Sequence, residues 1–446
     1  MTAKQNPRAM DEKGADSGPT GLLGLHDKAQ RYCNLCPRLC HHSCPVSNAE
    51  RDETVTPGHK NALAGRVARA IRPLDEEAAD IFYKCVNCGL CTTVCQHEND
   101  VSESLLSARA VAVRAGLEAP ALAELRRSFH SFGNAWLEDL RPRLRDLVPK
   151  DLRVGDGAAN HAGLGGRERG AGRSRRKLRV YWPGCAAVAR RPDLVSLTLE
   201  VLGRLGEGDV KVYCGDEAQC CGYPLLAAGQ HDAFVDQARK ASRALSGADV
   251  IFTASPECAW TFAVAWPRRA GLEPPARHVG HVVDLLLPAV ERAPMQSPLD
   301  LDVVYHDPCY LGRFLGRFDE PRSILKRLLQ RPPVEAGSWI RDEGYCCGAG
   351  GGLEITSPDT SLSIARARAG HLLGVTTGPP GEPASQAELA RASKNRHIAT
   401  ACTRCSIQFG EVGASAVDIV ELLARYLGIE GAANHPRLED ERGGGL

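Results

Sequence analysis

The second half of the chain contains one pattern of strands, helices and cysteines twice, and this internal repeat constrains the fold more than any other feature. Each copy begins with a short β-rich run that ends in a cysteine, at 178–185 and at 301–309. A helix, a Cys-Cys-Gly triplet, a second helix and a second strand follow in both copies. The copies close with matching apolar runs at 282–287 and 417–423. Alternating strands and helices predict an α/β sandwich with a parallel sheet in each copy.

The chain has 446 residues, enough for about three domains of roughly 150 residues each. We expect a multidomain α+β protein, in which an α-helical ferredoxin-like domain precedes the two α/β Cys-rich copies. The expected parts are a disordered tail (1–28), the ferredoxin domain (29–150), a Gly/Arg-rich linker (151–177), the first copy (178–298), the second copy (299–430) and a tail (431–446). Helices are expected at 60–71, 103–116, 119–129, 193–205 and 321–330, strands at 250–253 and 398–400, and an inserted loop at 377–386.

Composition limits the classes of partner and the cellular compartment. The net charge of +1 gives no electrostatic reason to expect nucleic acid, and we read the basic run at 173–177 as solvated linker. No apolar run is long enough for a spanning helix, and the polar start of the chain has no secretory h-region. We therefore expect a cytoplasmic protein without direct membrane insertion, which reaches a membrane only through a partner. In a reducing compartment, 18 cysteines indicate metal binding or redox chemistry rather than disulfides.

Two dense cysteine runs lie in the expected ferredoxin domain. Cys85, Cys88, Cys91 and Cys95 have the x2, x2, x3 spacing at which three thiolates wrap one cubane and the fourth reaches the other cluster. The companion run consists of Cys33, Cys36, Cys40 and Cys44. The pairing predicts two 4Fe–4S clusters with crossed ligation. One would be held by Cys33, Cys36, Cys40 and Cys95, and the other by Cys85, Cys88, Cys91 and Cys44.

The companion run departs from the usual spacing by one extra residue before Cys40, and Gln96 stands where a proline usually follows the last cysteine. A local bulge could absorb the extra residue, or His41 or His42 could replace a thiolate. A zinc site is the alternative for the whole region. A zinc site typically uses two separated Cys-x2-Cys knuckles. Two runs of four closely spaced cysteines do not match that pattern well.

The second copy of the repeat supplies five thiols, at Cys309, Cys346, Cys347, Cys402 and Cys405. The adjacent Cys346 and Cys347 cannot readily serve one iron, but they can ligate neighbouring irons of a larger cluster. The glycines that follow let the backbone approach sulfide closely and direct N–H groups at it. A dinucleotide site is disfavoured, because Leu353 occupies the place of the third glycine in G-x-G-x-x-G.

The first copy supplies only four corresponding thiols, at Cys185, Cys220, Cys221 and Cys258. Ser255 stands where the second copy has Cys402. Cys214 lies just upstream of the Cys-Cys-Gly triplet, either as a substitute ligand or as a buried small hydrophobic residue. We favour the second of these readings.

These motifs resemble those of a known family. The layout of two ferredoxin motifs and two Cys…Cys-Cys-Gly…Cys-x2-Cys units, together with the segments 306–313 and 346–352, resembles iron–sulfur oxidoreductases related to the heterodisulfide reductase D subunit. The iron–sulfur subunits of glycolate and lactate oxidation complexes and of anaerobic glycerol-3-phosphate dehydrogenase are also similar. The resemblance covers about residues 30–427. It implies that the five cysteines of the second copy hold a noncubane 4Fe–4S cluster, which cleaves a disulfide one electron at a time in heterodisulfide reductases.

The resemblance leads to two expectations about function. The first is an iron–sulfur oxidoreductase, acting alone or as a subunit, that passes electrons from the two ferredoxin clusters to the second copy. The second copy then reduces a disulfide or a redox partner. The alternative is a non-catalytic subunit of an FAD-linked 2-hydroxyacid (glycolate or lactate) or glycerol-3-phosphate dehydrogenase. In both cases a flavoprotein or a membrane b-type cytochrome must exchange the electrons, because the sequence shows no flavin or nicotinamide motif.

The two copies should also differ in role. The second copy, with all five thiols, is expected to carry the chemistry. The first copy should be structural, with an iron–sulfur cluster, zinc or nothing at its site, because a serine hydroxyl is a far poorer iron ligand than a thiolate. A redox-sensing regulator is disfavoured, because the sequence shows no DNA-binding element.

Overall fold

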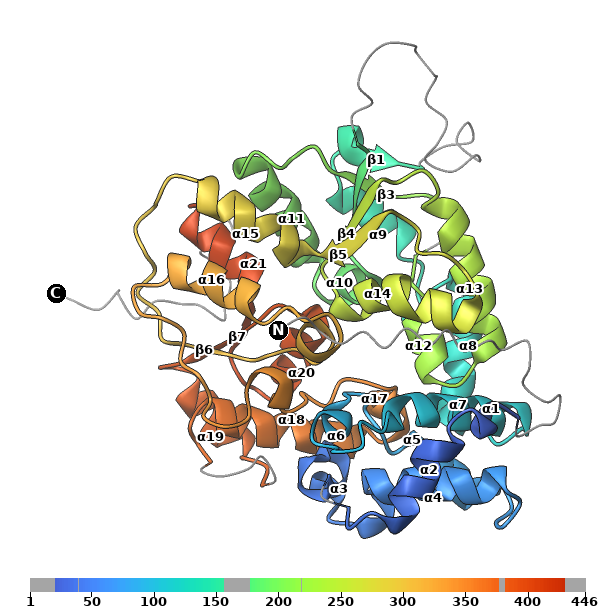
Figure 1. Ribbon diagram of the computed structural model, residues 1–446. Helices are drawn as coiled ribbons and strands as arrows, with labels where there is room; N and C mark the ends of the chain where they lie inside the picture. The colour runs from blue at the N-terminus through green and yellow to red at the C-terminus, as the bar shows by residue number, and fades with distance from the viewer. Residues whose placement is uncertain (1–20, 39, 156–176, 218, 377–381, 430–446) are drawn as a thin grey trace.

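The N-terminal third of the chain is helical, and the two repeat copies lie side by side against it (Figure 1). The computed structural model describes residues 21–38, 40–155, 177–217, 219–376 and 382–429. The helices of the N-terminal part are α1 Gly21–Gly24, α2 Asp27–Leu35, α3 Pro45–Glu50, α4 Pro57–Ala68, α5 Glu76–Tyr83, α6 Leu90–Thr93, α7 Val101–Arg114, α8 Pro120–Phe132 and α9 Arg141–Leu147, with 3-10 turns at His41–Ser43, Glu53–Val55 and Lys150–Leu152.

The helices of this part form around an aliphatic and aromatic core. The side chains of Leu23, Phe82 and Leu105 are fully buried in it. Side-chain caps fix where two of the helices begin, because Asp75 accepts the Ala78 N–H of α5 and Asp100 accepts the Glu103 N–H of α7. The tail predicted for 1–28 is therefore shorter at its inner end, where α1 and α2 contribute to the core; residues 1–20 lie outside the described part of the chain.

The first copy is a parallel sheet with helices on its faces. Its elements are β1 Arg153–Val154, β2 Arg179–Trp182, α10 Cys185–Arg190, α11 Pro192–Arg204, β3 Lys211–Tyr213, α12 Tyr223–Ala227, α13 His231–Ala244, β4 Val250–Thr253, α14 Pro256–Trp260, the π-helix Thr261–Ala270, β5 His278–His281 and α15 Val282–Arg292. The strand order is β1-β3-β2-β4-β5, and all neighbours are parallel.

The second copy has a smaller sheet in the order β6-β7-β8, again parallel. Its elements are β6 Val303–Tyr305, the π-helix Tyr310–Phe314, α16 Asp319–Leu328, the 3-10 turn Arg341–Glu343, α17 Leu353–Thr356, α18 Pro358–Leu372, α19 Gln386–Ala392, β7 His397–Thr400, α20 Thr403–Glu411, β8 Ala416–Asp418 and α21 Ile419–Tyr426. An isolated parallel bridge between Val304 and Val334 takes the place that β3 has in the first copy. The predicted fold class is confirmed.

The structure also bears on the segments predicted as linker and loop. Arg153 and Val154 pair with β3, so the beginning of the predicted linker belongs to the sheet of the first copy. Residues 156–176 lie outside the described residues, as do 377–381 of the predicted loop and the predicted tail from 431 onward. The predicted loop ends at Ser385, which caps α19 in a capping box with Glu388.

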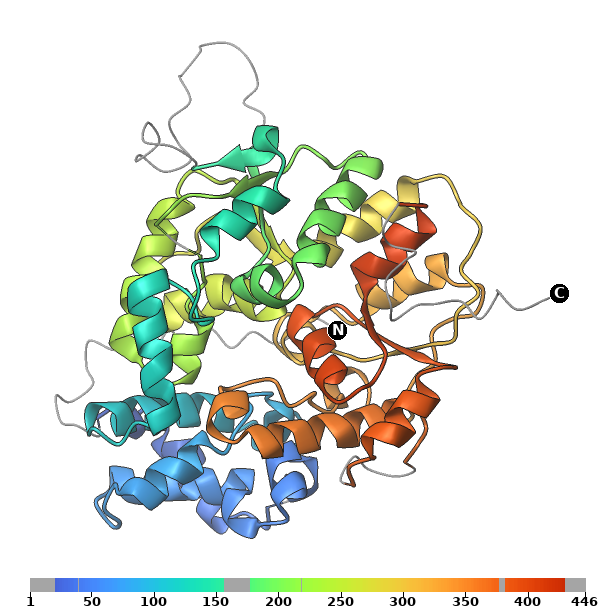
Figure 2. The ribbon, with the colours of Figure 1, turned by 180° about the vertical axis from the view of Figure 1, so that it is seen from behind.

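The two copies share one hydrophobic core. α11 and α15 of the first copy pack against α21 and α16 of the second, as Figures 1 and 2 show from opposite sides. Leu199, Leu286, Ile324 and Leu423 are buried together in this interface. The helices of each copy therefore cover apolar side chains of the other. No helix among the described residues is long and apolar enough to cross a membrane.

Sheet topology explains why the cysteines of each copy converge. Cys185 follows β2, the Cys220–Cys221 pair follows β3, and Cys258 follows β4 after a short turn. The second copy repeats this arrangement after β6, the Val334 bridge and β7. Because the carboxyl ends of parallel strands meet at one edge of the sheet, thiols that are distant in sequence become neighbours there.

Candidate metal centres and the cavity between the repeats

The structure brings the thiols of the ferredoxin part into two groups. The first group, called the outer ferredoxin group below, contains four neighbouring thiols, those of Cys33, Cys36, Cys40 and Cys95. Burial raises the pKa of Cys40 to about 11, and the nearby Cys33 and Cys95 add to this effect. Asn61 Nδ2 donates a hydrogen bond to Cys33 Sγ at 3.2 Å. These are the four cysteines that crossed ligation assigns to one cluster.

The second ferredoxin group lines a buried cavity. The cavity is lined by all four remaining thiols of this part and by Lys60; the thiols are Cys44, Cys85, Cys88 and Cys91. Lys60 is 1% exposed and its Nζ lies 3.9 Å from Cys44 Sγ, so it places a positive charge beside the thiols. A cation at this position favours thiolates, the form in which cysteine binds metal.

At three of the cysteines, the backbone N–H two residues further along the chain donates a hydrogen bond to the cysteine sulfur. Arg38 and Asn87, both with positive φ, stand two residues after Cys36 and Cys85. The backbone N–H of each donates to the preceding sulfur at 3.4 Å, and Gly348 does the same for Cys346 Sγ. Cys40, rather than His41 or His42, lies with the first group of thiols.

The five thiols of the second copy form one group, in which four are buried and Cys309 is partly exposed. Cys347 Sγ and Cys405 Sγ are 3.3 Å apart. The neighbouring Cys309 and Cys347 thiols raise the pKa of Cys346 well above its usual range. Cys402 contacts Cys405 at the start of α20. The donor set is all sulfur and shielded from water, which fits a metal–sulfur cluster.

His306 belongs to this second-copy group although its role was not predicted from the sequence. One of its ring nitrogens and the sulfurs of Cys347 and Cys405 lie within 4.8 Å of one another. Arg368 Nε donates to Nδ1 at 3.5 Å, which leaves the ring proton on Nε2. Burial lowers the pKa of His306, so the ring is neutral. Nε2 is buried and has no hydrogen-bond partner among the described residues, so it is free to donate to a sulfur of a bound cluster.

We predict that His306→Leu lowers the reduction potential of the second-copy cluster by on the order of 50 mV. A hydrogen bond donated to sulfur stabilises the more negative, reduced cluster, and about 1 kcal/mol corresponds to roughly that shift for one electron. A redox titration followed by electron paramagnetic resonance measures the shift. His371→Leu is the matched control, because His371 also contacts Arg368 but is not in the thiol group. Equal potentials in the two variants would contradict the assignment.

The second ferredoxin group and the second-copy group meet directly. The Cys88 and Cys346 thiols lie in one buried cluster, and the neighbouring Cys346 thiol lowers the pKa of Cys88 to about 6. Arg313 Nε donates a hydrogen bond to the Cys88 carbonyl oxygen at 2.8 Å, and the Asn48 amide donates one to the Tyr345 hydroxyl at 3.1 Å. The two groups of thiols are thus fixed relative to each other by contacts from both sides.

The glycine run after Cys347 makes this close approach possible. Gly350 and Gly351 lie against the backbone of Val86 and Cys85, and a Cβ on either glycine would collide with a carbonyl oxygen there. Arg109 of α7, which is 0% exposed, secures the junction. Its guanidinium donates to five carbonyls from three parts of the chain, those of Phe82, Tyr83, Cys85, Ala227 and Gly351.

The four thiols of the first copy also converge. Cys185 Sγ and Cys220 Sγ are 3.4 Å apart. Burial raises the pKa of Cys221, but hydrogen bonds from Cys220 and Cys258 outweigh this and hold it well below its usual range. Cys214 lies apart from them, in the core shared by both copies and 2% exposed. Its placement matches a buried small residue.

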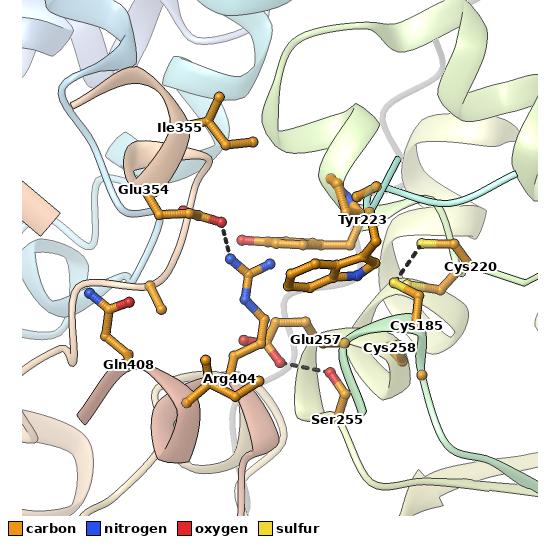
Figure 3. Close-up of a pocket in the computed structure, with 18 residues that line it drawn as sticks. Cys185, Cys220, Tyr223, Ser255, Glu257, Cys258, Glu354, Ile355, Arg404 and Gln408 are labelled. Carbon is orange, nitrogen blue, oxygen red and sulfur yellow. Dashed lines mark hydrogen bonds and ion pairs between the residues drawn. The ribbon is translucent and has the colours of Figure 1, made fainter. Parts of the chain in front are cut away.

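A cavity of about 200 Å³ lies between the copies and opens on the four thiols of the first copy (Figure 3). Ser255 Oγ donates to Glu257 Oε2 at 2.9 Å at its edge. From the second copy, Arg404 reaches into the cavity and forms an ion pair with Glu354. The five thiols of the second copy do not line this cavity. Cys402 itself does not line the cavity, but its Sγ lies 3.8 Å from the nearer carboxylate oxygen of Glu257, which does.

Sequence reasoning did not find Glu257 and Arg404. They occupy equivalent positions, immediately before the last cysteine of each copy, and each influences the other electrostatically. Burial raises the pKa of Glu257, which is 7% exposed. The available signal was a charged residue of opposite sign at the same place in Ser255-x2-Cys258 and Cys402-x2-Cys405.

Comparison with known proteins agrees with this arrangement. Residues 29–99 match the model of the 4Fe-4S dicluster domain, and residues 179–263 and 303–378 match that of the Cysteine-rich domain. These matches contain both ferredoxin groups of thiols and the Cys-Cys-Gly triplets of both copies. The predicted iron–sulfur character is confirmed.

Relatives extend the similarity over most of the chain. The D subunit of the Dihydromethanophenazine:CoB--CoM heterodisulfide reductase of Methanosarcina acetivorans is 31% identical over 384 residues, which are 82% of this chain and 87% of that protein. The protein of the same name from Methanosarcina mazei is 29% identical, with 80% of each chain covered.

A third relative carries a different name. The B subunit of the Fumarate reductase (CoM/CoB) of Methanothermobacter marburgensis is 30% identical over 77% of this chain and 63% of its own length. All three relatives are named as subunits of reductases. With its helical ferredoxin part, its paired Cys-rich copies and shared sequence over most of its length, the chain belongs to the family of iron–sulfur proteins that contains the heterodisulfide reductase D subunits.

Proposed function

We propose that this chain carries electrons from two 4Fe–4S clusters to a cluster in its second copy, and that the electrons there reduce a disulfide. One observation carries the proposal: Cys88 of the second ferredoxin group and Cys346 of the second-copy group pack in one buried cluster, where each influences the other electrostatically. Clusters held by touching ligands exchange electrons without an intermediate carrier. The contact thus gives the second copy a direct electron supply.

We propose that the crossed ligand sets hold the two cubanes and that the five second-copy thiols hold a noncubane 4Fe–4S cluster. The clusters supply single-electron chemistry when bound. The chain itself provides thiols at fixed spacing, N–H groups that stabilise charge on sulfur, and burial that excludes water. The content of the first-copy site, with its serine, stays open between an iron–sulfur cluster, zinc and no metal.

The partner would exchange electrons at the outer ferredoxin group. Three of its four thiols are partly exposed, at Cys36, Cys40 and Cys95, compared with two in the second ferredoxin group, at Cys85 and Cys91. Leu35, next to Cys36, is 88% exposed. An exposed apolar side chain beside a cluster suits the docking of a second protein. We propose a flavoprotein or a membrane b-type cytochrome as this partner.

The exposed outer group also supports the second candidate, in which the chain only connects an FAD-linked dehydrogenase to another acceptor. The first candidate is favoured by the complete set of five thiols in the second copy, since the resemblance associates such a set with disulfide cleavage.

The proposal is tested with the whole protein, purified without oxygen and reduced by dithionite, from which excess reductant is then removed. Mixing it with a small disulfide should restore the visible absorption of the oxidised clusters and release two thiols per disulfide. The neutral hydroxyethyl disulfide and the anionic dithiodipropionate are both assayed. If neither reoxidises the clusters while a viologen dye does, the chain conducts electrons but does not reduce disulfides, and the second candidate stands.

A further inference from the structure

The surface around the outer ferredoxin group has a charge unlike that of the whole molecule. Residues 27–38 and 61–72, which contain α2 and most of α4, hold six Lys and Arg residues and one acid, Asp27. Their net charge is +5, whereas that of the chain is +1. Including Glu98, which follows Cys95, still leaves +4. The two helices pack against each other at the lower edge of the molecule, away from both sheets (Figure 1). They form a local concentration of positive charge.

Part of this charge is not neutralised within the protein. Arg31 and Arg69 both form ion pairs with Asp27. Burial and three nearby guanidinium groups lower the pKa of His59 on α4, and these are the groups of Arg38, Arg66 and Arg72. Among the described residues, no carboxylate lies within ion-pair distance of three of the cations, Lys28, Arg38 and Arg66. These cations are available to an anionic partner.

The same helix pair exposes apolar side chains. Three of the five large hydrophobic residues that are exposed in the described part of the chain lie here, namely Tyr32, Leu35 and Ile71. Leu35 immediately precedes Cys36 of the outer ferredoxin group, whose thiol is itself partly exposed. The Tyr32 ring stacks on His97, two residues after Cys95 of the same group. Exposed apolar side chains with charged ones around them mark sites of protein association.

We propose that this basic and apolar surface docks an acidic face of the protein that exchanges electrons with the chain. The inference rests on the proposed function, because it specifies the partner at the outer ferredoxin group. A second copy of the chain would bring two basic surfaces together, and these repel each other. An anionic lipid surface matches the charge but carries no redox group for the exposed Cys36 site. A protein with acidic side chains around its flavin or haem matches both features.

The test uses two redox proteins of opposite charge, the acidic flavoprotein flavodoxin and the basic haem protein cytochrome c. The whole protein is reduced with dithionite, freed of excess reductant and mixed with either oxidised probe. Each electron leaves a reduced cluster and enters the FMN or the haem, and stopped-flow absorption measures the second-order rate. Raising the ionic strength from about 20 to about 200 mM should slow the reaction with flavodoxin at least fivefold, because salt screens attraction between opposite charges. The reaction with cytochrome c should not slow.

A flavodoxin rate that stays constant or rises with salt overturns the inference. If vesicles of phosphatidylglycerol bind the protein while the flavodoxin rate ignores salt, the surface is a membrane site and the proposed class of partner is wrong. Failure of disulfide reduction with the salt dependence intact counts against the proposed function and leaves the docking surface standing.

Paired variants identify the side chains that cause the salt dependence. The double variant Lys28→Gln/Arg66→Gln removes two unpaired cations, and it should slow the reaction with flavodoxin at least threefold at low ionic strength. Arg204→Gln/Lys240→Gln is the matched control, because it removes one Arg and one Lys that are exposed on α11 and α13 of the first copy. Equal rates in the two double variants contradict the docking surface.

Leu35→Ser tests the apolar part of the surface. It leaves the charge unchanged, so it should slow the reaction with flavodoxin at least threefold at both ionic strengths. Met295→Ser is the control, since Met295 is also exposed, at 66%, but lies after α15. An equal effect of both substitutions contradicts the role of Leu35. If Leu35→Ser loses iron, the two double variants decide.

Discussion

Replacing Cys347 with serine should abolish electron delivery to a disulfide while both ferredoxin cubanes still reduce with dithionite. Cys347 lies at the centre of the second-copy group, in contact with Cys346, Cys405 and His306. A hydroxyl is almost fully protonated near neutral pH and cannot replace a thiolate between irons. Iron content should fall, and reoxidation of the clusters by disulfide should slow at least a hundredfold. Stopped-flow absorption spectroscopy measures the rate.

Cys214→Ser is the control for this substitution. Cys214 is equally buried but packs in the core shared by the copies, so its replacement should cost roughly 1–3 kcal/mol of stability for the buried hydroxyl and leave the reoxidation rate within about twofold. If Cys347→Ser retains the rate, the second-copy group is not on the path. If Cys214→Ser loses it, Cys214 belongs to a metal site after all.

The largest effect on stability is expected from Arg109→Met. The guanidinium donates to five carbonyls, and methionine fills much of the volume but none of the hydrogen bonds. The loss should lower the free energy of unfolding by roughly 3–5 kcal/mol, which for a chain of this size corresponds to about 3–5 °C in the melting temperature. Because Arg109 joins the ferredoxin part to both copies, iron–sulfur absorption should bleach at the same lower temperature.

Arg114→Met on the same helix provides the comparison. Arg114 is 45% exposed and its nearest carboxylate, Asp232, is 3.9 Å away, so this variant should lose less than about 1 kcal/mol. Thermal unfolding of the whole protein, followed by circular dichroism and by cluster absorption, distinguishes the two. Similar melting temperatures in both variants would mean that Arg109 does not hold the three parts together.

The repeat made most of the fold predictable, because periodic apolar runs and cysteine spacing are local signals. The same signals could not show the edge strand Arg153–Val154. It has two residues, lies beside a Gly-rich stretch and forms only because β3 offers it a partner. The ordered helix α2 was hidden for a similar reason, since the burial of Leu23 beside it depends on helices much later in the chain.

The candidate sites divide in the same way. Each group of thiols could be listed from its spacing. The junction of Cys88 with Cys346 could not, because the two residues are far apart in sequence and meet only through the tertiary packing of glycines and Arg109. The cavity was unpredictable for a further reason. The Cys-x2-Cys motif fixes the cysteines and leaves the intervening residues free, and Glu257 and Arg404 are such intervening residues.

The equivalent positions of Glu257 and Arg404 have a consequence for the history of the chain. A duplication initially produces two identical halves. The residue before the last cysteine would then have been the same in both halves, and the two identical side chains would have met at the seam, the interface between the copies. Two acids or two guanidinium groups there would repel each other in a buried site. Such a seam is stable only with neutral residues or after one half has changed sign. The halves of this protein are therefore no longer interchangeable, and a chimera with two second halves would place two arginines face to face.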